Sequence, residues 1–120
     1  MLESMRQFQA GVFQALAHPT RVAMMEYLNY GELSVGQLCK KVGVEQANAS
    51  QHLAVLRNKH LVETRKEGNQ IFYRLRDPSL GEVLEAMRKF FLSHIGEALV
   101  MLRKEKHEAE KNKGGQEAGQ

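Results

Sequence analysis

The spacing of hydrophobic residues predicts five helices, because apolar side chains recur three or four positions apart in each. The helices are expected over residues 2–17, 19–29, 35–42, 46–57 and 78–106. Between the last two, residues 61–66 and 70–76 are expected to form two strands joined by a turn at Gly68-Asn69, because Ile71, Tyr73 and Leu75 alternate with Phe72, Arg74 and Arg76. Residues 32–33 are expected to form a very short strand. The sequence therefore predicts a mainly α fold with a small β-hairpin.

The third and fourth predicted helices are joined at a glycine. Ser34 can cap the third helix, and Gly43 can end it because glycine adopts the left-handed backbone conformation without steric cost. The fourth helix directs Ala49, Leu53 and Leu56 inward. With the hairpin as a wing, this arrangement predicts a winged helix-turn-helix in the order α-α-(β)-α-α-β-β-α.

The outer face of the fourth predicted helix suits contact with DNA bases. No acidic residue occurs between Gln46 and Arg57, and the amides and hydroxyls there can bond base edges. Base contacts are expected from Gln46, Asn48, Ser50 and Gln51. The expected phosphate or minor-groove contacts, near this helix and at the wing tip, are Lys40, Lys41, Arg57, Arg65, Lys66, Asn69 and Gln70. A solvated helix face would look similar, but the basic hairpin that follows favours DNA.

The chain has 120 residues and a formal net charge of +3, and the positive charge is concentrated in the helix-turn-helix and wing. Residues 34–76 hold eight Lys or Arg against three Glu, a local charge of +5 that suits binding to phosphates. One domain over 1–107 is expected, with 108–120 as a disordered tail. Because no apolar run is long enough for a signal peptide or a membrane span, we expect a cytoplasmic protein without a membrane partner.

The helix over 78–106 has more apolar positions than a small core needs. Together with the first helix it predicts a two-fold dimer interface formed by Phe8, Val12, Phe13, Leu84, Met87, Phe91, Ile95 and Leu99. Such a homodimer would present two recognition helices to successive major grooves of a pseudo-palindromic operator in double-stranded DNA. The alternative is that one protomer buries the whole helix.

Two segments carry a family resemblance: ALAHPTRVAMMEYL at 15–28 and ELSVGQLCKKVGVEQANASQHLAVLRNKHLVETRKEGNQIFYRL at 32–75. With the long helix that follows, the chain resembles the ArsR/SmtB winged-helix transcriptional regulators over roughly residues 8–105. The resemblance implies a homodimer that binds an operator and represses transcription until an inducer loosens it.

The resemblance also implies metal sites against which the sequence can be compared. Arsenic-sensing members carry three cysteines where residues 34–39, SVGQLC, hold only Cys39, so a trithiolate site is not expected in this chain. Zinc-sensing members carry an Asp-x-His pattern where this chain has Gly81 and Val83. Only His94 and Glu97 match the rest of that zinc site, which leaves zinc with too few ligands.

These observations predict a sequence-specific DNA-binding regulator with no cofactor and an unknown effector. The sequence shows no legible nucleophile and base, nucleotide loop or complete metal set, so an enzyme is not expected. Two alternatives stay open. The winged helix could be a protein-interaction module, or the chain could be a sensor that uses the metal candidates His94 and Glu97 or the redox candidate Cys39.

Overall fold

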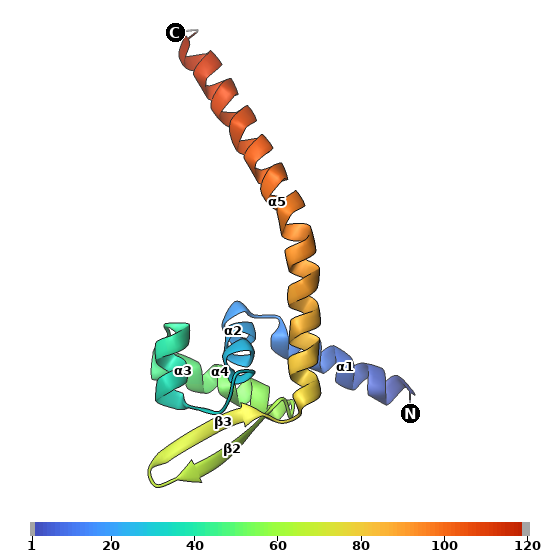
Figure 1. Cartoon of the computed structure of the whole chain (residues 1–120), viewed down its shortest axis with the longest axis vertical. Coiled ribbons are helices and arrows are strands. Elements are labelled where there is room, and N and C mark those ends of the chain that lie inside the picture. The colour runs from blue at the N-terminus through green and yellow to red at the C-terminus, as the bar shows by residue number, and fades with distance from the viewer. Residues whose placement is uncertain (1, 119–120) are drawn as a thin grey trace. The chain divides into compact units, whose positions relative to one another are not determined.

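The computed structural model describes residues 2–118, with side chains through residue 112, as two units that divide after Leu84 (Figure 1). The elements are α1 (Leu2–Leu16), α2 (Pro19–Leu28), β1 (Leu33–Ser34), α3 (Val35–Val42), α4 (Gln46–Asn58), β2 (Val62–Glu67), β3 (Gln70–Leu75) and α5 (Pro78–Ala118). This order confirms the predicted winged helix-turn-helix. The short first strand lies one residue later than predicted.

The last helix differs from the prediction at its C-terminal end. Instead of ending near Lys106, α5 continues to Ala118, so residues 108–118 are helical where a disordered tail is predicted. Glu, Lys and Ala are strong helix formers, and a stretch poor in large apolar residues can therefore continue a helix that is already nucleated. The rest of the predicted tail, 119–120, lies outside the described residues.

Side-chain caps fix where α2 and α3 begin. His18 Nδ1 accepts a hydrogen bond of 3.1 Å from the Thr20 amide, and Pro19 occupies the first turn of α2. At α3, Ser34 Oγ accepts from the Gln37 amide at 3.2 Å, while the Ser34 amide donates to Gln37 Oε1 at 2.9 Å. This capping box satisfies two main-chain donors at once, and it sets the start of the helix-turn-helix.

The wing is a three-stranded antiparallel sheet in the order β1-β3-β2. Leu33 pairs with Tyr73, while Val62 pairs with Leu75 and the register ends at Glu67 opposite Gln70. Gly68 turns the hairpin with φ of 62°, and Gly43 ends α3 with φ of 78°, both in the left-handed region. Because β1 directly precedes α3 and pairs with β3, the sheet joins the start of the helix-turn-helix to the β2-β3 hairpin.

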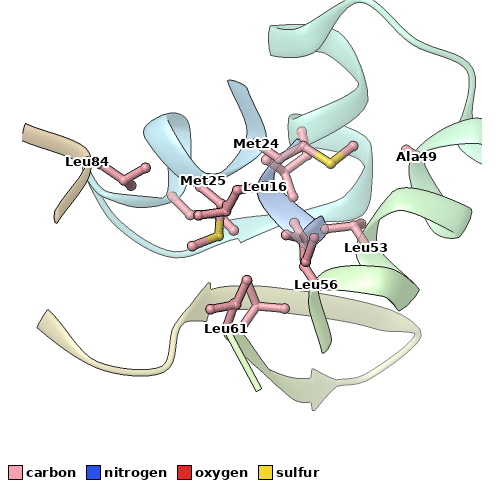
Figure 2. Close-up of a cluster of buried hydrophobic side chains, with 12 residues drawn as sticks. Leu16, Met24, Met25, Ala49, Leu53, Leu56, Leu61 and Leu84 are labelled. Carbon is pink, nitrogen blue, oxygen red and sulfur yellow. The ribbon is translucent and has the colours of Figure 1, made fainter. Parts of the chain in front are cut away.

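The core of the first unit gathers side chains from α1, α2, α3, α4, the start of β2 and the first turns of α5 (Figure 2). Its fully buried large side chains are Met24, Met25, Leu38, Leu53 and Leu56. The inward stripe predicted for α4 is thus confirmed. Leu84 is only 7% exposed and belongs to this core. It was predicted to lie in a dimer interface, but the first turns of α5 bring it onto α1 and α2 instead.

Gly81, near the start of α5, is buried against the C-terminal end of α2. A Cβ atom at this position would lie 2.1 Å from Asn29 Oδ1 and 3.0 Å from Asn29 Cγ. Such distances are far inside van der Waals contact, so glycine is what lets α5 approach Asn29 this closely.

The second unit is the part of α5 from Glu85 onward. All of its side chains described, over 85–112, are exposed. Its exposed large hydrophobic residues are Met87, Phe90, Phe91, Leu92, Ile95, Leu99, Val100, Met101 and Leu102. At 100° per residue these positions cover a broad arc of the helix, so more than one side of it is apolar.

Candidate nucleic-acid interface

The α4 helix exposes the face predicted to contact DNA bases. Gln46, Asn48, Ser50 and Gln51 are all exposed, while Ala49 is completely buried on the opposite side. The burial of Ala49, Leu53 and Leu56 fixes the rotation of the helix about its axis, so the polar side chains project outward. The core therefore holds these polar groups in one orientation.

Two clefts join α4 to the wing. One has a volume of about 250 Å³ and brings Gln46 of α4 together with Asn69 and Gln70 of the wing; it is lined by Ser34, Val35, Gly36, Gln46, Asn69, Gln70 and Ile71. The other, of about 400 Å³, is lined by Ser50, Ala54, Arg57, Asn58 and Tyr73. Five predicted DNA-contacting residues thus gather in two neighbouring clefts.

Sequence reasoning missed Tyr73, Asn58, Ala54, Gly36 and Ile71 as residues that line these clefts. Tyr73 illustrates why these residues could not be identified from the sequence. The strand alternation shows that it shares a face with Ile71 and Leu75, but its position beside α4 depends on how the sheet packs against the helix. The strand pattern alone contains no information about that packing.

Arg65 is held by two carboxylates within the wing. Its guanidinium lies 2.6 Å from Glu32 Oε1 and 2.6 Å from Glu67 Oε2, and 4.6 Å from the centre of the Phe72 ring. Hydrogen bonds to Glu32 and then Glu67 raise the pKa of Arg65. A phosphate would have to compete with both carboxylates for this side chain. Lys66 is exposed, and no carboxylate in the described part of the chain lies within ion-pair distance of it.

The other predicted phosphate contacts lie at helix ends. Arg57 is in the last turn of α4 and lines the larger cleft. Lys40 and Lys41 are in the last turn of α3 and line neither cleft. Lys41 Nζ instead lies 5.7 Å above the ring of Tyr27, which is 37% exposed. The structure therefore brings Arg57 beside the face of α4 that is predicted to contact bases, but not these two lysines.

The metal candidates lie in the second unit and the redox candidate lies in the first. His94 Nδ1 lies 2.8 Å from the Phe90 carbonyl oxygen, and its ring stacks on Phe90 with centroids 4.4 Å apart. Over residues 2–112, no three His, Cys, Asp or Glu side chains gather into a group that could hold a metal ion. Cys39 is a half-buried free thiol. The predictions about metal and redox sensing stay predictions.

A hydrophobic groove of about 380 Å³ lies between α1 and the start of α5. It is lined by Phe8, Gln9, Val12, Phe13, Leu16, Met25, Leu80, Val83 and Leu84. Phe8 is 55% exposed and Phe13 is 64% exposed, whereas Val12 packs against the core. The first unit therefore leaves part of its predicted dimer surface open to solvent.

No helix in the described chain is both long and apolar enough to cross a membrane.

Comparison with known proteins identifies the family. Residues 18–64 match the family model of the bacterial regulatory proteins of the arsR family. An uncharacterized HTH-type transcriptional regulator of Mycobacterium tuberculosis is 35% identical over 101 residues, which are 83% of this chain and 89% of that protein. The biofilm growth-associated repressor of Agrobacterium fabrum is 41% identical over 80 residues, 67% of this chain and 68% of that protein.

The same family appears among solved structures. The homodimeric winged helix-turn-helix DNA-binding domain of a possible ArsR-family regulator from Mycobacterium bovis aligns with a TM-score of 0.74 and 25% identity. The alignment covers 79% of this chain and 88% of that chain. The fold, the exposed polar face of α4 and these likenesses agree: the chain belongs to the ArsR family of winged helix-turn-helix transcriptional regulators.

Proposed function

We propose that this protein is a homodimeric repressor that binds a specific DNA operator and is released by an effector. The observation that carries the proposal is the exposed polar face of α4, which the core holds beside the two clefts shared with the wing. Gln46, Asn48, Ser50 and Gln51 are positioned there to read base edges in the major groove. One relative is named as a repressor and another as a transcriptional activator, so the proposal of repression follows the first of these likenesses.

Dimerisation is proposed from the apolar surface that each unit exposes by itself. Phe8 and Phe13 are more than half exposed in the first unit. In the second unit, the residues proposed for the interface are Met87, Phe91, Ile95 and Leu99. Exposed apolar surface of this extent is usual where another chain binds, and a relative described as homodimeric supports the same conclusion. A dimer would bind the two halves of a pseudo-palindromic operator.

The test is fluorescence anisotropy with the protein's own promoter DNA and with random DNA of the same length. Gln51→Ala is expected to cost about 1–3 kcal/mol on the promoter and little on random DNA, because it removes a base contact. Gln7→Ala, which removes an exposed amide from α1, serves as the matched control. Equal losses of affinity on both DNAs would indicate that Gln51 contacts the phosphate backbone. A salt-insensitive complex with a partner protein, without a DNA footprint, would instead favour a protein-interaction module.

Phosphate contacts are tested by the salt dependence of the same binding. Lys66→Ala is expected to weaken promoter and random DNA alike, and to reduce the slope of log affinity against log salt by about one. Arg65→Ala is expected to change this slope less, since Arg65 is already paired with Glu32 and Glu67. The reverse order of slopes would show that DNA displaces those carboxylates.

We further propose that the effector is not arsenite or zinc. Cys39 is the only cysteine, and His94 and Glu97 supply at most two zinc ligands from each chain. Promoter binding is expected to be unchanged by arsenite, zinc or peroxide in the anisotropy assay. Release by zinc alone would identify His94 and Glu97 as ligands, and release by peroxide alone would identify Cys39 as a sensor.

A further inference from the structure

Arg21 of α2 connects three helices of the first unit. Its Nε donates a hydrogen bond to the Ala15 carbonyl, and its Nη2 donates to the Gln14 carbonyl at 3.4 Å, both at the end of α1. Its Nη1 lies 3.4 Å from Nδ1 of His52, which belongs to α4. One half-buried guanidinium therefore joins the end of α1, the first turn of α2 and the helix that carries the proposed base-reading face.

His18 lies on the other side of His52. The two imidazole rings have centroids 4.4 Å apart at an interplanar angle of 42°. His18 Nδ1 caps α2 by accepting from the Thr20 amide. Because a main-chain N–H and a guanidinium can only donate, Nδ1 must be an unprotonated acceptor in both histidines. The arrangement therefore favours the neutral His52 tautomer that carries its proton on Nε2.

Adding a proton to Nδ1 of His52 is unfavourable for two reasons. On Nδ1 of His52 it would make a donor face the donor group of Arg21, and it would place a positive charge beside both Arg21 and His18. Two titratable or charged side chains face His52: Arg21 of α2 and His18, which caps α2. The groups that α1 adds to this cluster are the main-chain carbonyls that accept hydrogen bonds from Arg21. Burial, then His18 and Arg21, lower the pKa of His52.

We propose that Arg21, His18 and His52 are positioning residues for α4, and that they hold it in place only while the His52 imidazole is neutral, so that operator binding weakens on acidification. This inference rests on the proposed function. His52 follows Gln51 directly, so a change in its contacts acts on the turn that carries a predicted base contact.

The sign of the effect distinguishes this proposal from simple electrostatics. Extra positive charge on a DNA-binding protein ordinarily strengthens phosphate binding. If the histidines acted only as charges, acid would therefore increase promoter affinity. Loss of affinity at low pH, with the dimer still folded, is the opposite result and requires a change in how α4 is held.

The experiment measures promoter affinity by anisotropy from pH 7.5 to 5.5 at constant ionic strength. For the wild type we expect a loss of about three- to tenfold, below the limit of about tenfold per pH unit for one linked proton, because the pKa of His52 lies below its usual value. His52→Gln keeps an acceptor for Arg21 but does not titrate, so it should stay within about twofold across the range. His107→Gln, a control on exposed α5, should follow the wild type. A flat wild-type profile, or tighter binding in acid, would overturn the proposal.

A second variant and an independent measurement complete the test. His18→Asn can still cap α2 and leaves His52 beside Arg21, so its promoter affinity should still fall with acidification, as in the wild type. Circular dichroism and sedimentation at each pH establish that the dimer stays intact. Arg21→Lys keeps the charge but cannot reach α1 and His52 together, so it should bind the promoter more weakly even at pH 7.5.

NMR separates failure of the inference from failure of the proposed function. Without DNA, protonation of His52 is expected to shift the amide signals of Thr20 and Arg21 with the same midpoint. Amide signals that do not respond would overturn the inference even if promoter binding is confirmed. A wild type that binds no promoter at pH 7.5 would count against the proposed function, while a shared midpoint would still support the coupling of the three residues.

Discussion

Residues 2–84 bury a hydrophobic core while leaving side chains such as Phe8 and Phe13 exposed, whereas residues 85–112 present all of their large hydrophobic side chains to solvent. The buried core of the described chain ends at Leu84. Beyond it, exposed apolar residues such as Phe91 and Ile95 recur at helical spacing without partners in the same unit. A core stabilises one protomer, but an exposed apolar helix gains burial only from another surface. The comparison shows that burial of apolar side chains stabilises the first unit within one protomer, while the apolar residues of the second unit gain no such burial there.

The largest expected effect lies in the core of the first unit. Leu53→Ala removes a completely buried side chain and should lower the free energy of unfolding by about 2–5 kcal/mol, since both burial and packing are lost. Urea denaturation measures this change. Val55→Ala, on the same helix but 37% exposed, should cost less than about 1 kcal/mol. Equal losses for the two variants would contradict the division between core and surface.

The second prediction addresses assembly through the second unit. Phe91→Glu places a charge on its apolar arc and should weaken the dimer by at least about 100-fold, or about 2.7 kcal/mol, as measured by sedimentation equilibrium. Ser93→Glu introduces the same group on the opposite side of the helix and should leave the dimer intact. If both variants stay dimeric, Phe91 does not lie in the interface.

The third prediction concerns Gly81, just before the boundary between the units. Gly81→Ala should destabilise the protein by about 1–3 kcal/mol, because its Cβ would overlap the Asn29 amide. In an Asn29→Ala background the same change should cost little, since the obstructing atoms are gone. Urea denaturation of the four proteins in this double-mutant cycle measures the coupling. A cost that is equal in both backgrounds would show that Asn29 is not the obstacle.

A smaller effect is expected at the start of the helix-turn-helix. Ser34→Ala removes one half of the capping box on α3 and should cost about 1 kcal/mol in a thermal or urea denaturation. Ser34→Asp keeps an acceptor for the Gln37 amide and should retain most of the stability. A loss as large for Asp as for Ala would indicate that the hydroxyl acts through its buried packing instead.

The smallest effect is a dependence of stability on pH. Because the pKa of His52 is lowered in the folded state, the unfolded chain binds more protons near pH 6.5. The contribution of His52 is therefore present above that pH and is lost as the pH falls through the folded pKa. Urea denaturation at pH 7.5 and 5.5 should show this loss in the wild type and a smaller one in His52→Gln. Identical losses would exclude His52 as its source.

Local patterns predicted most of the fold. The inward positions of α4 and the alternation in β3 follow from the periods of a helix and a strand, so both could be predicted without a structure. The caps at Ser34 and Gly43 were equally local. The sequence failed where contacts are distant: Leu84 has the same spacing as Met87 and Phe91, yet only packing against α1 and α2 assigns it to the core.

The candidate site was predictable to a similar degree. The outward residues of α4 follow from its buried stripe, which is why Gln46 and Ser50 were found. The partners of Arg65 could not be predicted, because Glu32 is thirty-three residues away and meets Arg65 only through the pairing of β1, β3 and β2. Charge counting treats Arg65 and Lys66 as equivalent, whereas the structure pairs one and leaves the other exposed.

The contact between Gly81 and Asn29 also limits how this protein can evolve. In the zinc-sensing pattern that the sequence was compared with, residue 81 would carry a carboxylate ligand. Any side chain at residue 81 first meets the Asn29 amide, so a lineage that gained the carboxylate alone would lose stability before it gained a ligand. A zinc site here would need new ligands at residues 81 and 83, and the Asn29 side chain would also have to turn away or be replaced.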